Sequence, residues 1–250
     1  MTKEEQQVEK RLLDLAETAY RRGIAVYSDF LNLNELHIYQ GIRMKLSYVE
    51  TESFGGYELA ERQMAAFYPD ALFCLEYPLA CLWISPLQEK FAEKLTHRDF
   101  LGAVLNLGLD RSRVGDILAE EQGAALFCHK SVAGFICENL TRIRHTSVYA
   151  QPLEQTEFHY EPKYEERTGT VASVRLDSLL SLAFGASRSS LTALIEGGRV
   201  FVNGKLTASN GYVPKEGDLV SVRGMGRFCF YSSGGQSKKG RSYVTVRKYS

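Results

Sequence analysis

Apolar residues in the last third of the chain repeat with the period of two short helices. In the first repeat they stand at i, i+3, i+4 and i+7, as Leu176, Leu179, Leu180 and Ala183, which predicts one buried stripe. Gly185 ends this helix, and Ser187 is the expected N-cap of a second helix that runs to Glu196. The pattern therefore predicts two short helices that share a core.

A strand and a tight turn are expected directly after the second helix. Val200 and Val202 alternate with Phe201 and Asn203, which is the period of a strand. Asn203 and Gly204 form the dipeptide that most strongly favours a two-residue hairpin turn. Two helices followed by a hairpin are thus predicted within residues 174–205.

The first 75 residues have the pattern of a small α+β unit. Residues 1–22 predict an amphipathic helix that Gly23 closes, with an inner face made by Val8, Leu12, Leu15, Ala16 and Ala19. The elements expected next are a helix after Asn34 and strands in 45–53 and 56–69 around a Gly55-Gly56 turn. Aromatic side chains are frequent here, and core packing explains them more simply than base stacking.

Residues 76–150 predict strands and helices in the order β-α-β-β-α-β. The expected strands are 79–85, 114–121, 124–130 and 145–150, and the expected helices are 98–109 and 131–143. This order fits a ferredoxin-like, RRM-like sheet with two helices on one face. Phe127 is the only aromatic residue in the strand 124–130, so base stacking by this sheet is in doubt.

A change of composition separates this region from the C-terminal one. Residues 151–167 hold five acids, two prolines and a net charge of −3, which is typical of an acidic linker or a covering strand. Beyond it, 218–233 and 241–250 predict closing strands around a basic, glycine-rich loop. We therefore expect an α+β multidomain protein with domains at 1–75, 76–150 and 168–250.

Charge is unevenly divided although the whole chain is neutral. Residues 168–250 contain twelve Lys and Arg against four acids, a net charge of +8, so the other residues carry −8. A basic terminal domain on a neutral chain favours nucleic-acid binding. Arg188 supports this prediction, because a cation in the first turn of a helix opposes the helix dipole unless an anion binds there.

The C-terminal residues resemble the S4 RNA-binding domain. The matching positions are Arg175-Leu176-Asp177, Gly185, Ser187-Arg188, Leu194-Ile195, Gly198, Val200, Val202-Asn203-Gly204, Val213 and Gly217-Asp218. The resemblance implies an S4 (αL-type) fold that binds structured RNA through phosphates and shape. It implies RNA contacts by Arg175, Arg188, Arg199, Asn203 and Lys205.

Further residues are candidates for the same interface. Ser189, Arg223 and Arg227 belong with the S4 contacts because they lie beside its helix start and its later strands. A possible secondary RNA contact comprises Arg111, Arg113, Lys238, Lys239 and Arg241. We name no catalytic residue and no metal ligand.

Other classes of protein lack support in the sequence. His97-Arg98-Asp99 copies the start of a kinase catalytic loop, but Val104 stands where that loop requires asparagine. The five cysteines form no CxxC pair, which argues against a zinc or disulfide framework. No apolar run approaches the length of a membrane span, and the charged start is unlike a signal peptide. We expect a cytoplasmic monomer with no membrane association and no cofactor.

The whole chain resembles the YlmH family of bacterial S4-domain proteins. The supporting stretches are GGYELAERQ (55–63), HRDFLGAVLNLGLDRSRVGDI (97–117) and TGTVASVRLD (168–177). Genes of this family lie among cell-division genes. The resemblance implies a non-catalytic factor that binds rRNA of the large ribosomal subunit, with tRNA as a further ligand, in ribosome-associated quality control. Its partners would be RNA and the ribosome.

Two other functions remain open from the sequence. One is an RNA-modifying enzyme, pseudouridine synthase-like or methyltransferase-like, that uses the S4 domain for targeting and has Asp99, Asp110 or Asp116 as its acid. Helix capping and surface solvation explain these three residues more simply. The other is a division-protein adaptor that uses the acidic N-terminal surface.

Overall fold

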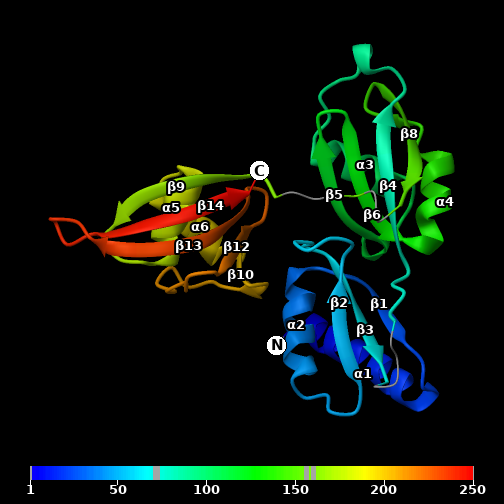
Figure 1. Cartoon of the computed structure of the whole chain (residues 1–250), viewed down its shortest axis with the longest axis horizontal. Helices are drawn as coiled ribbons and strands as arrows, with labels where there is room; N and C mark the ends of the chain where they lie inside the picture. Colours follow the sequence, from blue (N-terminus) through cyan, green and yellow to red (C-terminus); the bar gives the residue numbers. More distant parts are fainter. Residues whose placement is uncertain (1, 70–73, 155–157, 159–161, 250) are drawn as a thin grey trace. The chain divides into compact units, whose positions relative to one another are not determined.

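The chain forms two compact units in a computed structural model (Figure 1). Residues 2–69, 74–154, 158 and 162–249 are described. The first unit is Met1–Tyr160 and the second is Glu161–Ser250.

The N-terminal part of the first unit is a three-stranded antiparallel sheet with two helices. Its elements are α1 (Lys3–Arg22), β1 (Val26–Leu31), α2 (Leu33–Arg43), β2 (Glu50–Phe54) and β3 (Gln63–Tyr68), with strand order β1-β3-β2. Helix α1 buries Leu12, Ala16 and Ala19, and Gly23 ends it in the left-handed conformation. The predicted first helix and its cap are confirmed.

Local corrections concern the elements that follow α1. The sequence pattern did not predict strand β1. This partly buried strand pairs with β3. Helix α2 starts before Asn34 because Asn32 and Glu35 form a capping box. Strand β2 occupies only the end of the expected 45–53 strand, and β3 only the second half of 56–69.

The following part has the predicted β-α-β-β-α-β order. Its elements are β4 (Leu79–Pro86), η1 (Glu89–Phe91), α3 (His97–Asn106), η2 (Arg111–Arg113), β5 (Val114–Glu120), β6 (Gly123–His129), α4 (Lys130–Asn139), β7 (Arg142–Ile143) and β8 (Thr146–Leu153). The antiparallel strand order is β5-β6-β4-β8-β7. Helix α4 ends earlier than predicted because Arg142 and Ile143 pair with β8. The ferredoxin-like arrangement is confirmed.

The central strands β4 and β6 of this sheet are covered on both faces. One face packs on α3 and α4 through residues such as Leu82, Val104 and Ile136. On the other face Phe127 packs against Tyr57, with ring centroids 5.3 Å apart. Since an RNA-recognition motif stacks bases on the central strands of this second face, burial of Phe127 removes the stacking position on β6.

A polar network ties the two parts of the first unit together. The Asp116 carboxylate on β5 accepts hydrogen bonds from Tyr57 Oη at 2.8 Å and from the Glu61 amide at 2.6 Å. Arg62 donates from Nε to the Val114 carbonyl oxygen at 2.9 Å and from Nη2 to the Phe30 carbonyl oxygen at 2.9 Å. The burial of Arg62 lowers its pKa, and the Asp116 charge opposes that effect.

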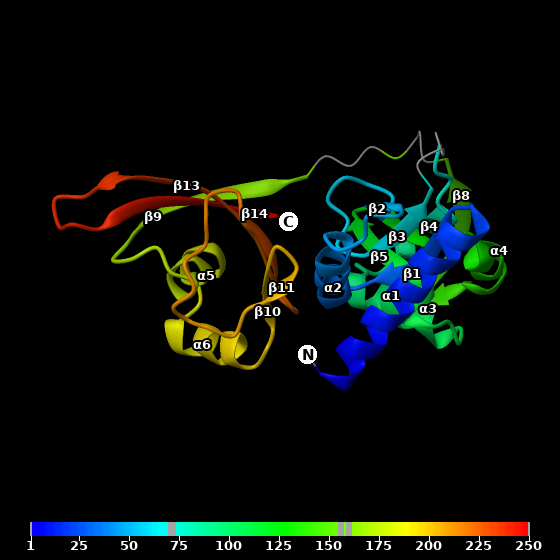
Figure 2. The same ribbon diagram turned by 90° about the horizontal axis from the view of Figure 1, so that it is seen from below.

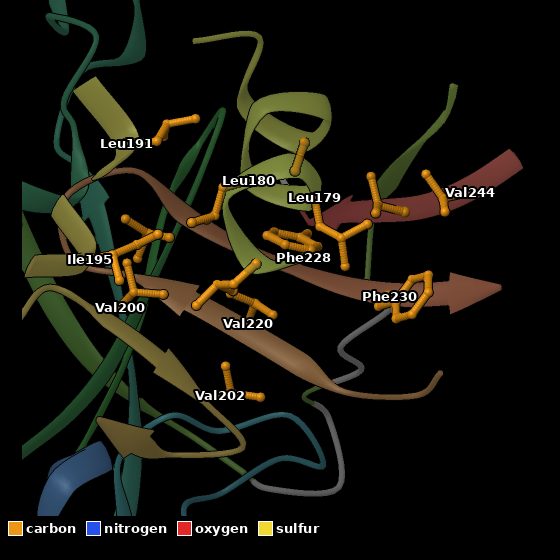
Figure 3. Close-up of a cluster of buried hydrophobic side chains, with 14 of the residues drawn as sticks. Leu179, Leu180, Leu191, Ile195, Val200, Val202, Val220, Phe228, Phe230 and Val244 are labelled. Atoms are coloured by element: carbon orange, nitrogen blue, oxygen red, sulfur yellow. The ribbon is translucent and has the colours of Figure 1, made fainter. Parts of the chain in front are cut away.

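The second unit is a six-stranded antiparallel sheet with two helices on one face (Figure 2). Its elements are β9 (Tyr164–Val171), α5 (Leu176–Phe184), α6 (Arg188–Glu196), β10 (Val200–Val202), β11 (Lys205–Leu206), β12 (Leu219–Val222), β13 (Gly226–Gln236) and β14 (Ser242–Tyr249). The strand order is β11-β10-β12-β13-β14-β9. Leu179 and Leu180 of α5 and Ile195 of α6 point into the core with Val200 and Phe228 (Figure 3).

The predictions for α5, α6, the hairpin and the closing strands are confirmed, and one expectation needs correction. Asn203 and Gly204 both have positive φ, 49° and 77°, as a type I′ turn requires. The stretch 218–233 forms the two strands β12 and β13, with the chain turning between Val222 and Gly226. The end of the expected linker 151–167 belongs to strand β9, which pairs with β14. Residues 155–157 and 159–161 of that linker lie outside the described residues.

Candidate RNA-binding surface

Two arginines meet where helices α5 and α6 begin. Arg175 is the N-cap residue of α5, and Arg188 is the first residue of α6 after its N-cap Ser187. Arg188 donates from Nη2 to the Ser178 hydroxyl at 3.2 Å, while its side chain stays exposed. Arg175 Nε lies 3.8 Å from Asp177 Oδ1. Both guanidinium groups therefore converge on the start of α5.

Local hydrogen bonds hold this arrangement. Asp177 Oδ1 accepts from the Ser178 amide at 2.9 Å, which fixes the carboxylate beside Arg175. The amide of Leu176 donates to the Tyr212 carbonyl oxygen at 2.8 Å, so the loop before β12 lies next to the same helix start. Contacts with the start of α5 position both arginines, and both residues are exposed.

Asp177 and Ser178 were not among the expected site residues. Their positions give them a supporting role, because each contacts one of the two arginines. Ser178 is buried, so only its contact with Arg188 reveals that role. The sequence signal was the Asp-Ser pair directly after Arg175 and Leu176, at the expected start of a helix.

Ser189 lies in the first turn of α6 beside Arg188. Its hydroxyl is 3.1 Å from the hydroxyl of Ser187. Ser187 in turn accepts from the Ser190 amide at 3.4 Å, which caps the helix. Hydroxyl groups and exposed helical amides thus surround Arg188, and this combination suits a phosphate.

Arg199 and Arg223 form a second pair of cations. The Arg223 amide donates to the Arg199 carbonyl oxygen at 2.9 Å. The Arg223 guanidinium carbon lies 4.9 Å from the centre of the Phe201 ring, a cation–π geometry. Both side chains are exposed. These two expected contacts are adjacent in space although they are far apart in the sequence.

Asn203 and Lys205 differ in how their side chains are used. Asn203 donates from Nδ2 to Asp218 at 2.8 Å, and its Oδ1 accepts from the Leu219 amide at 2.9 Å. Both ends of the amide therefore fix the turn against β12. Lys205 is exposed on β11, and within the described part of the chain its ammonium group has no ion pair. Lys205 can reach a phosphate without breaking a contact.

Arg227 lies on β13 opposite Ser221, which also pairs with Phe201, whereas the β13–β14 loop lies away from these pairs. Arg227 is buried, with its guanidinium carbon 5.4 Å from the centre of the Tyr249 ring. Lys238 and Lys239 are exposed in the loop between β13 and β14, at the far end of the second unit from β10 and β11 (Figure 2). Arg241 donates from Nη2 to the Thr170 carbonyl oxygen at 2.6 Å. This loop is a separate basic region.

Arg111 and Arg113 serve contacts within the first unit. Arg111 donates from Nη1 to the carbonyl oxygens of Val114 and Gly115. Burial, with the nearby charge of Arg62, lowers the pKa of Arg111 to about 10. Arg113 lies 3.3 Å from the Asp29 carboxylate on β1. These contacts give both residues a structural role that the sequence did not indicate.

The three acids considered for catalysis have distinct surroundings. Asp99 accepts from the Thr96 amide and hydroxyl at 2.9 and 2.7 Å, and these bonds lower the pKa of Asp99. Asp116 belongs to the network between the two parts of the first unit. Asp110 is exposed before η2. No group of three or more potential metal ligands occurs among the described residues, nor does a helix able to cross a membrane.

Family models match three successive segments of the chain. They are described as "YlmH, N-terminal" at residues 4–72, "Putative RNA-binding domain in YlmH" at 76–157 and "S4 domain" at 174–220. None of these descriptions names a catalytic activity.

Two similar proteins extend this comparison. The chain is 30% identical over 198 residues to the Bacillus subtilis (strain 168) "Ribosome-associated protein quality control protein P2", covering 78% of this chain and 76% of that protein. The solved "Cell division protein ylmH from Streptococcus pneumoniae" has a TM-score of 0.52 at 22% identity, covering 63% of this chain and 95% of that one, and shares the fold. The sequence of domains and the length of the match to the Bacillus subtilis protein show that this chain belongs to the YlmH family.

Proposed function

We propose that this protein binds structured RNA through the cations at the start of α5 and α6, with Arg199, Lys205 and Arg223 extending the contact. The observation that carries the proposal is the position of Arg188. It lies in the first turn of α6, 3.2 Å from Ser178 and without a carboxylate partner in the described residues. A phosphate there would satisfy both the guanidinium donors and the positive end of the helix.

We further propose that the RNA belongs to the large ribosomal subunit, with tRNA as a second ligand. The name of the Bacillus subtilis relative supports a role in ribosome-associated quality control, and the match to that protein includes most of both chains. The excess of twelve cations over four acids in residues 168–250 supports a polyanionic partner. A monomeric factor of the cytoplasm fits this role.

The first unit would position the protein rather than act on the RNA. The descriptions that match residues 4–72 and 76–157 support two domains close to the expected 1–75 and 76–150. The Asp116 network joins them, so we expect them to move as one body. Asp99 and Asp116, considered as catalytic acids, have structural hydrogen bonds instead, which favours a non-catalytic factor.

Crosslinking of the protein to RNA in living cells tests this proposal. Irradiation followed by sequencing of the attached RNA should recover large-subunit rRNA far above background, and tRNA if the second ligand is correct. Recovery of rRNA no higher than from an untagged strain would contradict the proposal. Mass spectrometry of rRNA from deletion and wild-type cells gives an independent check, since a missing modification in the deletion strain would favour an enzyme.

A further inference from the structure

The sheet of the second unit has a face that its helices leave uncovered (Figure 2). On β14, Val244 and Val246 point into the core beneath α5 and α6. Successive side chains of a strand alternate between faces, so Tyr243, Thr245 and Arg247 lie on the opposite face. The same alternation places Tyr164 of β9 there, because Tyr164 pairs with Tyr249.

Arg247 is stacked between aromatic rings on this face. Its guanidinium carbon lies 3.4 Å from the centre of the Tyr231 ring and 4.7 Å from that of Tyr164. Glu166 accepts from Arg247 Nε at 2.8 Å and holds the guanidinium in place. Tyr231 reaches this position through an irregularity in the pairing of β13 with β14 between Phe230 and Ser232. The rings and the guanidinium are therefore held before any ligand arrives.

The rings on this face are open to solvent. Tyr164, Tyr231 and Tyr243 are 45%, 47% and 47% exposed. A single exposed tyrosine needs no explanation, but three on one sheet face, two of them against a fixed guanidinium, form a surface on which flat groups can stack. We call Tyr164, Tyr231, Tyr243 and Arg247 the tyrosine face.

Charge at the end of this face favours a nucleic acid over a protein segment. Strands β13 and β14 lead into the loop that carries Lys238 and Lys239, and Arg241 binds Thr170 at the same end. Glu166 is paired with Arg247, so its charge is balanced. Exposed aromatic rings next to unpaired cations are the two parts of a surface for single-stranded nucleic acid: rings stack the bases and cations contact the backbone.

We infer that the tyrosine face stacks unpaired bases of a single-stranded RNA segment, whose phosphates contact Lys238 and Lys239. This site is separate from the cations of α5 and α6, since it lies on the other face of the sheet. It rests on the proposed function in one respect, because both sites take RNA. A molecule with both surfaces recognises a paired region together with an adjoining unpaired strand.

Binding of labelled oligouridine tests the inference. Oligouridine of about 12 nucleotides is longer than a single stacking site, and its bases are unpaired. Fluorescence anisotropy would compare the full chain with Tyr243→Ala, Tyr231→Ala and the corresponding Phe variants. Tyr149→Ala is the matched control, because Tyr149 is 42% exposed on β8 of the first unit. A fully paired RNA duplex of the same length is the second ligand.

If each Ala variant loses the stacking of one base, its affinity for oligouridine should fall at least about fivefold. Both Phe variants and Tyr149→Ala should bind like the natural protein, and the affinity of the Ala variants for the duplex should stay within about twofold. Oligouridine affinity unchanged by Tyr243→Ala would overturn the inference. Altered sedimentation of the free Ala variants would also overturn it, by identifying the face as a protein interface.

Further measurements distinguish loss of base stacking on the tyrosine face from loss of folding and from loss of RNA binding by α5 and α6. If Tyr231→Ala unfolds, Tyr243→Ala still decides, since Tyr243 takes no part in the Arg247 stack. Crosslinking oligouridine to the natural protein should attach it to peptides from β9, β13 or β14, and attachment only elsewhere contradicts the site. Arg188→Glu should weaken duplex binding whatever the Tyr variants do, so the two proposals fail independently.

Discussion

At the residue scale, the contacts of each arginine decide its role. Arg62 and Arg111 direct their donors at carbonyl oxygens inside the first unit. Arg188 contacts one buried hydroxyl and otherwise faces solvent. The sequence could place Arg188 at a helix start, because the Ser187 cap is a local signal. It could not show that Arg111 turns inward, because its acceptors are the backbone carbonyl oxygens of Val114 and Gly115, and every residue has such a group.

Replacing Asp116 should destabilise the first unit. Asp116→Ala removes the acceptor of Tyr57 Oη and of two backbone amides. We expect the free energy of unfolding to fall by about 3 kcal/mol, because buried donors would be left unpaired. Urea unfolding followed by the fluorescence of Trp83, the single tryptophan, measures it. Exposed Asp110 is the control, since Asp110→Ala should change stability by less than about 0.5 kcal/mol. Equal effects would contradict the role of the network.

The cysteines should differ sharply in reactivity. Burial raises the pKa of both Cys81 and Cys128 to about 12, so at pH 8 only about one thiol in ten thousand is ionised. Cys74 is exposed. Iodoacetamide at this pH should label Cys74 while Cys81 and Cys128 stay unlabelled until denaturant is added, as mass spectrometry of peptides would show. Labelling of Cys81 as fast as Cys74 in the folded protein would contradict the packing of β4.

At the element scale, local signals predicted some elements and tertiary pairing decided others. Helices α5 and α6 follow from apolar spacing and from their end residues Gly185 and Ser187. Strand β9 does not, because its sequence YEERTGTV is largely polar. It becomes a strand through pairing along β14 and through the Arg247–Glu166 ion pair. A partner eighty residues away leaves no mark in a local pattern, and the acidic residues of β9 therefore left a linker and a covering strand equally open.

A substitution at Gly56, between β2 and β3, should test how the N-terminal part packs on β6. A Cβ at Gly56, where φ is +105°, would lie 2.3 Å from the Phe127 ring. Gly56→Ala should lower the free energy of unfolding by about 2 kcal/mol or more, through overpacking and backbone strain. Gly134 on α4 is the control, because nothing lies within 4 Å of an added Cβ. Gly134→Ala should stabilise by up to about 1 kcal/mol. A neutral Gly56→Ala would contradict the interface.

At the scale of the whole molecule, charge and burial together support the proposed binding surface on the second unit. The sequence predicted the basic third of the chain and the S4 positions within it. It left base stacking by the sheet of residues 76–150 in doubt, and the burial of Phe127 against Tyr57 removes the stacking position on its central strand β6. Such burial depends on two segments that are distant in the sequence. Which surfaces stay open to RNA therefore depends on how the chain folds.

RNA affinity should depend steeply on salt. If the α5–α6 surface neutralises about four phosphates, log K should fall with log salt at a slope on the order of −3, so doubling the salt weakens binding about eightfold. Titration of a structured RNA at several potassium chloride concentrations measures the slope. A slope near zero would show that phosphates contribute little, and the cations would then need another role.

Cosedimentation with large ribosomal subunits tests whether Arg188 contacts ribosomal RNA. Arg188→Glu reverses the charge in the first turn of α6, and Arg98→Glu makes the same change in the first turn of α3, where Arg98 is also exposed. Glutamate suits both helix starts, so both variants should fold. We expect Arg188→Glu to stay in the supernatant and Arg98→Glu to pellet with the subunits like the natural protein. Normal pelleting of folded Arg188→Glu would contradict it.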